Sequence, residues 1–316
     1  MVSAARRDLG LAVRCAGVGA TLGLVLGAGA VLAACGTNEL EPIRPGPTVD
    51  AGGSSMGTRD AAAVTQSCKR GVAMNDGPGA AFAASASAPG VAWFYDWAAQ
   101  SPGDENPRVE FVPMIWGGGS LTQAVPAGAR YLLGFNEPDF KSQSNLTAQQ
   151  AASDWPAVQA KARAAGVPLV SPSVNFCGAT QCSDPTATDP YTYLEEFFAD
   201  CAGCEVDYIG VHAYQCDVPS LEGYLDGNTD AGGTLEGFAQ FGKPLWITEL
   251  ACDSTHSVAD QKAYMQAAVP YLEGNARVFR YAWFNADPIP NAELTNGDGS
   301  LTDLGTTYVG LAATCP

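Results

Sequence analysis

The sequence predicts an α/β protein with a single (β/α)8 fold, the TIM barrel, held by disulfides. Short runs rich in β-branched and aromatic residues recur through residues 67–316, with helical or loop stretches between them. Several runs are apolar almost throughout, for example 206–211, as a parallel strand covered on both faces requires. Eight such runs in roughly 250 residues suit one barrel domain. A doubly wound sheet is the alternative, because helical patterning is poor in the first and third connections.

The eight predicted strands alternate with segments that can form helices or loops. The clearest helix is 147–165, where apolar residues recur near helical spacing and Gly166 provides a stop. A second helix is predicted from 258 to 272, and Pro270 is expected to bend or end it. The predicted strands are 71–75, 91–97, 110–116, 131–137, 168–174, 206–214, 244–251 and 278–285.

Residues 1–34 are predicted to be an export signal, separate from the folded domain. Arg6, Arg7 and Arg14 flank the start of an apolar stretch at 16–32. An ordinary secretory signal or a single membrane span would also fit this stretch. The pair of adjacent arginines is also found in signals for twin-arginine export.

The segment that follows the apolar stretch predicts a lipid anchor. Residues 32–35, Leu-Ala-Ala-Cys, resemble a bacterial lipobox, so Cys35 is the predicted lipidation site and mature N-terminus. Residues 35–66 consist mainly of Gly, Pro, Ser, Thr and Ala, which predicts a flexible tether. We therefore expect an exported, membrane-anchored lipoprotein at the bacterial cell surface or in the periplasm.

The charge of the chain restricts its partners. The formal net charge is −17, and the predicted signal carries three arginines and one aspartate, so the remainder is still more acidic. Such a protein is not a plausible nucleic-acid binder, and anionic headgroups would repel it unless a lipid held it there. A neutral substrate fits better, and we expect a monomer that meets the membrane only through its lipid.

The cysteines predict a disulfide framework. The chain has 10 cysteines, and an even number remains once Cys15 in the signal and Cys35 are set aside. Sequence alone allows about 105 pairings of eight cysteines. Proximity favours Cys177–Cys182 and Cys201–Cys204. Closure of the chain on itself favours Cys68–Cys315, which leaves Cys216–Cys252 as the fourth predicted pair. The alternatives are a zinc site or a redox role at Cys201 and Cys204, but no second close pair, suitably spaced histidine or βαβ context supports them.

Two glutamates each close an apolar run. Glu137 ends the fourth predicted strand, and Glu249 lies near the end of the seventh. Catalytic groups of such barrels lie at the carboxyl ends of the strands, so we expect the two carboxylates to meet there. Most enzymes that cleave a glycosidic bond require two such carboxyl groups.

Four phrases of the sequence resemble one family of enzymes. They are Gly-Phe-Asn-Glu-Pro-Asp at 134–139, Trp-Ile-Thr-Glu at 246–249, Tyr-Ala-Trp-Phe at 281–284 and Gly-Ser-Leu-Thr-Asp-Leu-Gly at 299–305. Together they resemble glycoside hydrolase family 128, the Asl1-like β-1,3-glucanases, from about residue 69 to residue 315. The resemblance implies hydrolysis of β-1,3-glucan with retention and endo action, without a cofactor or a metal.

The resemblance also implies roles for individual residues. By position it makes Glu137 the acid/base, with a raised pKa, and Glu249 the ionised nucleophile. It gives Asn136 a hydrogen bond to the sugar 2-hydroxyl and Tyr214 a hydrogen bond to the nucleophile. Alternation points His212 the same way as Tyr214, so we expect it to line the sugar site. The alternative is a His–Tyr pair buried in the barrel with its hydrogen bonds satisfied internally.

Aromatic rings stack on sugar faces and leave the hydroxyl groups free to hydrogen-bond. Any ring could instead fill the core, as we expect for Trp93. The predicted sugar contacts, in addition to those above, are Trp283, Trp116, Tyr95 and Trp97, with Asn75 and Asn175 as polar contacts.

Two other functions stay open. The chain could be a glucan-binding surface lipoprotein without turnover, or a hydrolase of another β-linked polysaccharide such as mannan, xylan or mixed-linkage glucan. A calcium loop at 296–300 does not fit, since the glutamate it needs is absent. A serine nucleophile does not fit either, because no serine stands in an elbow context.

Overall fold

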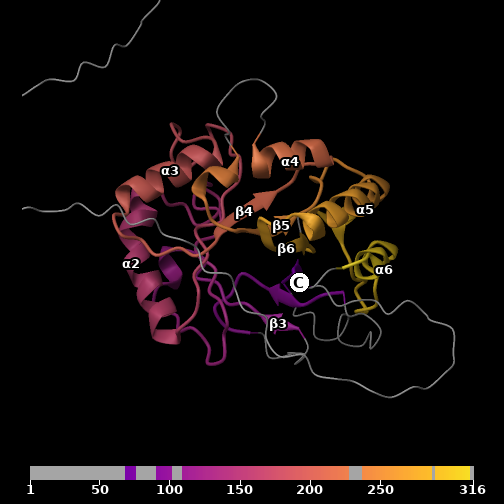
Figure 1. Cartoon of the computed structure of the whole chain (residues 1–316), viewed down its shortest axis with the longest axis horizontal. Helices are drawn as coiled ribbons and strands as arrows, with labels where there is room; N and C mark the ends of the chain where they lie inside the picture. Colours follow the sequence, from indigo (N-terminus) through magenta and orange to yellow (C-terminus); the bar gives the residue numbers. More distant parts are fainter. Residues whose placement is uncertain (1–67, 76–89, 102–108, 228–236, 287–288, 314–316) are drawn as a thin grey trace, which may run out of the picture. The chain divides into compact units, whose positions relative to one another are not determined.

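In the computed structural model of the protein, six parallel strands form one sheet at the centre of the part of the chain that is described (Figure 1). The structure describes residues 68–75, 90–101, 109–227, 237–286 and 289–313. The predicted signal at 1–34, the tether at 35–66 and the anchor Cys35 lie outside these ranges.

The sheet has the strand adjacency of a ring. Its order is β3-β2-β1-β6-β5-β4, and all of its pairs are parallel. The first strand pairs both with its successor and with the last strand, as the strands of a closed barrel do. The strands are β1 (Arg70–Ala73), β2 (Trp93–Tyr95), β3 (Glu110–Phe111), β4 (Ile209–Ala213), β5 (Leu245–Leu250) and β6 (Val278–Phe284).

Two further segments continue the parallel pairing between the edge strands β3 and β4. Isolated parallel bridges join Met114 to Leu133, Leu132 to Leu169, and Val170 to Tyr208. The predicted fourth and fifth strands, 131–137 and 168–174, thus lie in order between the two edges of the sheet. The TIM-barrel prediction is confirmed, with six segments as regular strands and two paired through isolated bridges.

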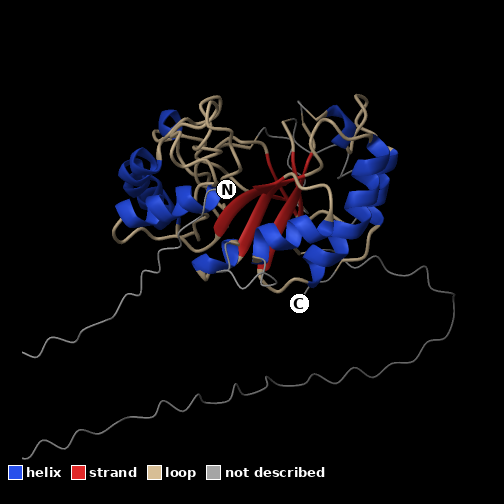
Figure 2. Ribbon diagram, turned by 90° about the horizontal axis from the view of Figure 1, so that it is seen from above, coloured by secondary structure: helices blue, strands red, loops and turns tan. Residues whose placement is uncertain are grey.

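Helices follow the fourth to eighth parallel segments in turn and cover the outside of the sheet (Figure 2). Neighbours along the chain also lie side by side, α2 with α3, α4 with α5, and α5 with α6. Between the third and fourth segments lies only a short 3₁₀ helix, η1 (Gly118–Ser120), as the poor helical patterning there predicted. The others are α2 (Ala148–Ala165), α3 (Pro190–Asp200), α4 (Val218–Asp226), η2 (Phe238–Phe241), α5 (Val258–Gly274), η3 (Pro290–Ala292) and α6 (Asp303–Gly310).

Local signals fix the ends of α2. The Thr147 side chain accepts the N–H of Gln150, and the Gln150 side chain accepts the N–H of Thr147, which is a capping box. Gly166 ends the helix in the left-handed conformation, with φ 69°. The buried face carries Trp155, whose ring packs edge-on against Phe135 of the fourth barrel segment.

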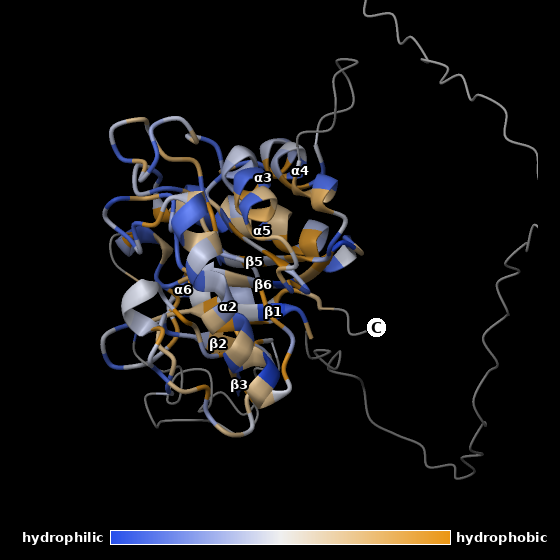
Figure 3. Cartoon of the chain, turned by 90° about the vertical axis from the view of Figure 1, so that its left-hand side faces the viewer, coloured by the Kyte–Doolittle hydropathy of each residue, from blue (hydrophilic) through white to orange (hydrophobic). Residues whose placement is uncertain are grey.

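The helix α5 extends beyond the predicted end. It runs through Pro270 to Gly274, although the sequence predicted a bend or a stop at this proline. Leu272 on the last turn is fully buried, so packing against the barrel offsets the hydrogen bond that proline cannot make. The helices carry hydrophilic as well as hydrophobic residues, in keeping with one buried side (Figure 3). None of the helices in the described ranges combines the length and apolar character needed to cross a bilayer.

Packed side chains close the barrel interior near the amino ends of the strands. The Arg280 guanidinium lies 4.6 Å from the ring centre of Tyr131 and 5.1 Å from that of Trp246. Its charge is paired with Glu110 at 2.7 Å. Trp93 joins this cluster and is fully buried, as predicted. The carboxyl ends of the strands are thus left as the place for a ligand.

Three of the predicted disulfides are present. They are Cys177–Cys182, Cys201–Cys204 and Cys216–Cys252. The last of these joins the segments that follow β4 and β5. Cys315 lies outside the described residues, so the pair Cys68–Cys315 stays a prediction.

Candidate active site

Glu137 lies at the carboxyl end of the fourth parallel segment, in a left-handed turn. Its backbone φ is 37°, in a region that residues other than glycine rarely adopt. The Glu137 N–H donates to the carbonyl of Ser173 at 2.8 Å, and Asn136 forms a parallel bridge with the same Ser173. The neighbouring barrel segment therefore holds this strained conformation in place.

Glu249 owes its orientation to an irregularity in β5. Trp246 packs on the other aromatic rings of the barrel interior, and the Thr248 hydroxyl donates to Ser173 Oγ at 3.0 Å, also inside the barrel. Strict alternation would turn Glu249 to the opposite face of the strand. The register of β5 shifts against both of its neighbours around Thr248, and this bulge turns Glu249 inward as well.

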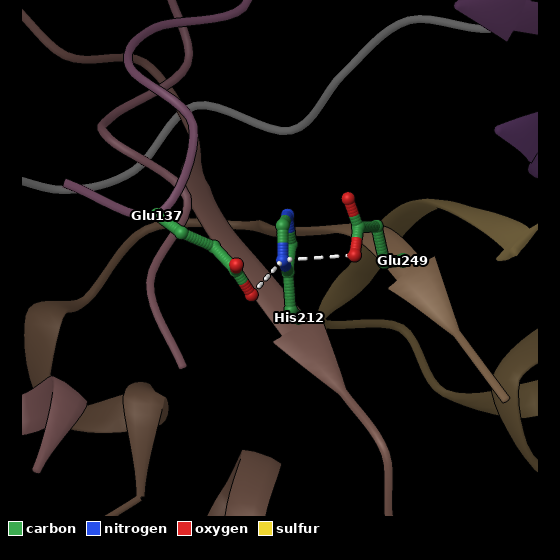
Figure 4. A group of neighbouring side chains, drawn as sticks. All are labelled: Glu137, His212 and Glu249. Carbon is green, nitrogen blue, oxygen red and sulfur yellow. Dashed lines mark hydrogen bonds and ion pairs between the residues drawn. The ribbon is translucent and has the colours of Figure 1, made fainter. Parts of the chain in front are cut away.

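The two glutamates meet on either side of one histidine ring (Figure 4). His212, on β4, places Nδ1 2.8 Å from Oε1 of Glu137 and 3.1 Å from Oε2 of Glu249. One oxygen or nitrogen from each of the three residues lies within 4.8 Å of the others. All three side chains are buried, and His212 completely. Carboxylates from distant parts of the sequence thus converge at the carboxyl ends of the strands.

Glu249 accepts hydrogen bonds on both of its oxygens. Trp97 Nε1 donates to Oε1 at 2.9 Å, and the Tyr95 hydroxyl donates to the same oxygen at 3.4 Å. The Tyr214 hydroxyl donates to Oε2. The predicted contact between Tyr214 and the nucleophile candidate is therefore present. Donors on both sides stabilise the ionised form of Glu249 and fix its orientation.

Burial and neighbouring charges set the protonation of this group. The pKa of Glu249 is raised, and burial is the largest cause. The charge of Glu137 raises this pKa further, whereas the charge of His212 and the donated hydrogen bonds lower it. Burial lowers the pKa of His212, but the charges of Glu249 and Glu137 outweigh burial and raise it. Burial and Glu249 also raise the pKa of Tyr214, which stays protonated as a donor.

The carboxylates open into a cavity of about 610 Å³. Both Glu137 and Glu249 line it, whereas Tyr95 and His212 are fully buried and contact Glu249 from behind the wall. The prediction that these two residues touch the sugar is therefore corrected to a role in holding the carboxylates. The predicted sugar contacts that do line the cavity are Asn75, Trp97, Trp116, Asn136, Asn175 and Tyr214.

Trp283 does not line the cavity, and its prediction as a sugar platform is wrong. Its ring is fully buried, donates Nε1 to the carbonyl of Ala292 at 2.8 Å, and packs against Tyr264 of α5 and Tyr308 of α6. The adjacent Phe284 lines the cavity in its place. Alternation along β6 sends Trp283 outward to the helices and Phe284 inward.

Asp139 is a buried carboxyl group for which the sequence predicted no role. It is 2% exposed; Oδ2 accepts the N–H of Asn175 at 3.2 Å, and Oδ1 has no hydrogen-bond partner among the described residues. Burial, followed by the charge of Glu137, raises the pKa of Asp139 to about 8. Its place two residues after Glu137 was the signal available in the sequence.

The rest of the cavity lining was not predicted from the sequence. All of them except Phe284, the last residue of β6, follow the carboxyl ends of the fourth, seventh and eighth segments, on connections that carry no periodicity. Closeness to a predicted strand end was the only signal. They are Phe140, Gln143, Asp253, Ser254, Phe284, Ala286 and Ile289.

The catalytic candidates also form a donor set that could hold a metal ion. Glu137, His212 and Glu249 each offer one ligand atom, and these atoms lie within 4.8 Å of one another. In this arrangement, however, Nδ1 of His212 already lies at hydrogen-bond distance from both carboxylates. The absence of a metal or cofactor requirement stays a prediction.

A barrel with two buried carboxylates facing one cavity at the carboxyl ends of its strands has the arrangement that glycosyl hydrolases of this fold use. Residues 71–308 match the family model described as glycosyl hydrolase catalytic core. A subgroup II endo-β-1,3-glucanase of glycoside hydrolase family 128 from Sorangium cellulosum is 39% identical, with a TM-score of 0.67, over 78% of this chain and 100% of that one. The chain belongs to the glycosyl hydrolase catalytic core family and, within it, to glycoside hydrolase family 128.

Two further relatives extend the comparison. A subgroup I endo-β-1,3-glucanase from Amycolatopsis mediterranei, solved in complex with laminaritriose, is 29% identical with a TM-score of 0.59, over 77% of this chain and 98% of that one. Alkali-sensitive linkage protein 1 of Schizosaccharomyces pombe is 28% identical over 255 residues, 76% of this chain and 44% of that protein. The chain thus spans less than half the length of this curated relative.

Proposed function

We propose that the chain is an endo-β-1,3-glucanase that hydrolyses its substrate with retention of anomeric configuration. The observation that carries the proposal is the close approach of Glu137 and Glu249 across His212: one carboxylate oxygen of each glutamate and a ring nitrogen of His212 lie within 4.8 Å of one another. Carboxyl groups of retaining glycosidases stand roughly 5–5.5 Å apart, whereas inverting enzymes need roughly 6.5–9.5 Å to admit a water molecule. The spacing favours retention.

The relatives support the choice of polymer. The Sorangium and Amycolatopsis proteins are endo-β-1,3-glucanases, and the latter binds laminaritriose. A neutral glucan also suits a protein of net charge −17. The cavity offers indole rings from Trp97 and Trp116 beside amide groups, the combination that a pyranose with apolar faces and polar edges requires.

The two carboxyl groups divide the reaction between them. Ionised Glu249 attacks the anomeric carbon while Glu137 donates its proton to the glycosidic oxygen, so the bond to the leaving chain breaks as the bond to Glu249 forms. Glu137, now ionised, then takes a proton from water. The resulting hydroxide equivalent attacks the anomeric carbon and releases Glu249, and the second inversion restores the original configuration.

His212 suits both halves of this cycle. The negative charge lies on Glu249 before the first step and on Glu137 after it. Nδ1 lies within hydrogen-bond distance of one oxygen of each carboxylate. One N–H group therefore serves whichever carboxylate is ionised, without movement of the backbone.

Asn136 is proposed to hold the 2-hydroxyl group of the reacting sugar. It lines the cavity next to Glu137, and its Oδ1 is buried without a hydrogen-bond partner among the described residues. A buried acceptor of this kind costs free energy unless a ligand satisfies it. A sugar hydroxyl is the donor that the proposed substrate would bring.

We also propose that the enzyme is an exported, monomeric lipoprotein. The apolar stretch and the lipobox-like segment before Cys35 support export and lipidation, and the composition of 35–66 supports a tether. Growth with radiolabelled palmitate tests the anchor, because Cys35→Ser should abolish incorporation of label. Label that persists in this variant would contradict lipidation at Cys35.

The activity is tested by release of reducing ends from a soluble β-1,3-glucan. The wild-type protein should release them, and both Glu137→Gln and Glu249→Gln should lose more than about a thousandfold in kcat. Glu195→Gln, an exposed change on α3, is the matched control and should keep full activity. Substantial turnover in either catalytic variant would contradict the proposal. Binding of the glucan by wild type without release would support a non-catalytic glucan-binding protein instead.

A parallel panel of mannan, xylan and mixed-linkage glucan tests the choice of polymer. The β-1,3-glucan should be hydrolysed with the highest kcat/KM. Faster hydrolysis of another polysaccharide would replace the proposed substrate while leaving the reaction class intact.

A further inference from the structure

Phe176 is an exposed aromatic residue beside the cavity that the proposed mechanism does not use. Among the described residues, two large hydrophobic side chains are exposed, Phe176 by 50% and Val258 by 48%. Isolated exposed apolar residues are common on soluble proteins, so exposure alone says little. The surroundings of Phe176 distinguish it, because it directly follows Asn175, whose side chain approaches Glu137.

The position of Phe176 follows from Asn175. This residue lines the cavity, and its Nδ2 lies 3.4 Å from Oε1 of Glu137. Its Oδ1 accepts the backbone N–H of Phe176 at 2.8 Å. Phe176 is therefore the residue next to the cavity wall, on the side of the site that carries Glu137.

Two tyrosines hold the ring of Phe176 from behind. The ring centres of Tyr191 and Tyr224 lie 6.0 and 5.6 Å from that of Phe176. The Tyr224 hydroxyl donates to the carbonyl of His212 at 2.9 Å, and the Tyr191 hydroxyl donates to the carbonyl of Tyr224 at 3.0 Å. One part of the ring thus rests on side chains tied to the site, and the other part faces outward.

The segment after Phe176 is fastened to the segment after Glu137. The Cys177–Cys182 disulfide closes its loop, and Cys182 forms an antiparallel bridge with Phe140, a cavity residue. Ser183 Oγ donates to the carbonyl of Pro138 at 2.7 Å. The distance from Phe176 to the acid/base is therefore set by covalent and hydrogen-bonded links, as preorganised binding requires.

We propose that Phe176 forms a subsite outside the cavity, where its ring stacks on a glucosyl residue of the leaving side of the β-1,3-glucan chain. The side follows from chemistry, because Glu137 protonates the oxygen of the leaving group and Phe176 lies on the Glu137 side. A pyranose ring presents an apolar C–H face that a flat exposed ring binds, while its hydroxyls remain in water. This inference rests on the proposed function and adds a specificity-determining residue to it.

The subsite is tested by the dependence of kcat/KM on substrate length. Linear β-1,3-oligosaccharides of three and of six glucosyl units are hydrolysed by the wild type, Phe176→Ala, Phe176→Trp and Val258→Ala. The ratio of kcat/KM for the long substrate to that for the short one should fall about tenfold in Phe176→Ala. Phe176→Trp, which keeps a flat ring, should restore the ratio. Val258→Ala, the similarly exposed control, should leave it unchanged.

The outcomes separate this subsite from the proposed function. An unchanged ratio in Phe176→Ala, or an equal fall in Val258→Ala, would overturn the subsite while the glucanase assignment stands. Failure of the wild type to cleave either oligosaccharide would overturn the proposed function itself. Should Phe176→Ala unfold, Phe176→Leu keeps the packing on the tyrosines and removes the flat ring, and the same fall in ratio is expected from it.

Discussion

The hydroxyl of Tyr214 donates to Oε2 of Glu249, so a phenol on the segment after β4 holds one oxygen of the carboxylate at the end of β5. Nδ1 of His212 approaches the same oxygen at 3.1 Å. Alternation along β4 and the residue after it turns both donors to the same side, towards Glu249. The proposed nucleophile is therefore oriented by two residues that lie two positions apart, His212 on the neighbouring strand β4 and Tyr214 directly after it.

Replacement of Tyr214 by phenylalanine tests how much the hydrogen bond from Tyr214 to Glu249 contributes to catalysis. The hydroxyl stabilises ionised Glu249, so Tyr214→Phe should raise the pKa of Glu249 and move the acidic limb of the pH profile of kcat/KM to higher pH. We expect kcat to fall by about ten- to a hundredfold, the range for a hydrogen bond to a charged group. Tyr271→Phe, which removes a hydroxyl bound to Asp226 on the outside of the barrel, is the matched control. An acidic limb that does not move would contradict the contact.

His212 is expected to act on both carboxylates at once. In His212→Gln the pair would lose the N–H group that stabilises its single negative charge, so the first ionisation of the pair would move to higher pH. We predict a fall in kcat of at least about a hundredfold, with KM changed much less. The measurement is the pH dependence of kcat together with thermal unfolding. A folded variant with a wild-type profile would show that His212 is only a core residue.

Asp139 is expected to make stability depend on pH. Its pKa is raised from 3.8 to about 8, so the folded protein holds this proton more tightly than the unfolded chain does. Its contribution to the free energy of unfolding therefore falls as pH rises from about 4 towards about 8. The groups facing it are Glu137, His212, Tyr193 and Tyr224.

Asp139→Asn removes this ionisation and gives the measurement. Between roughly pH 5 and pH 8 the wild type should lose up to about 4 kcal/mol more stability than the variant, by urea unfolding. The free energy of unfolding of the variant should therefore increase relative to that of the wild type as pH rises. Parallel pH dependences would show that Asp139 is already ionised in the folded protein at neutral pH.

The Cys216–Cys252 disulfide is expected to support activity as well as stability. It joins the segment that carries Tyr214 to the segment that follows Glu249, across a sequence separation of 36. Replacing both cysteines by serine should cost about 3 kcal/mol of stability and should lower kcat by loosening the Tyr214–Glu249 contact. The double serine variant of Cys201 and Cys204, neither of which lines the cavity, should leave kcat unchanged. Equal kcat values in the two variants would contradict the link to catalysis.

The sequence predicted the barrel because its strands are buried on both faces. Such strands form apolar runs that stand out between polar connections, and their ends indicate where Glu137 and Glu249 lie. Alternation also predicted that His212 and Tyr214 point the same way. That signal failed for Trp283, since aromatic residues occupy both faces of β6 and nothing local shows which face meets the helices.

Other features depend on tertiary contacts that leave little trace in the sequence. The bulge that turns Glu249 inward is a matter of register between three strands. The burial of Asp139 depends on segments that follow it by tens of residues, such as the one that contains Asn175. The cavity walls beyond the strand ends come from connections without periodicity.

The anomer formed first during hydrolysis tests the central claim most directly. Proton NMR of β-1,3-glucan digested by the wild-type enzyme records the anomeric configuration before mutarotation erases it. Retention through Glu249 predicts that the β-anomer appears first and the α-anomer grows in later. An α-anomer that appears first would show a single inverting displacement and would contradict the proposed roles of Glu137 as acid/base and Glu249 as nucleophile.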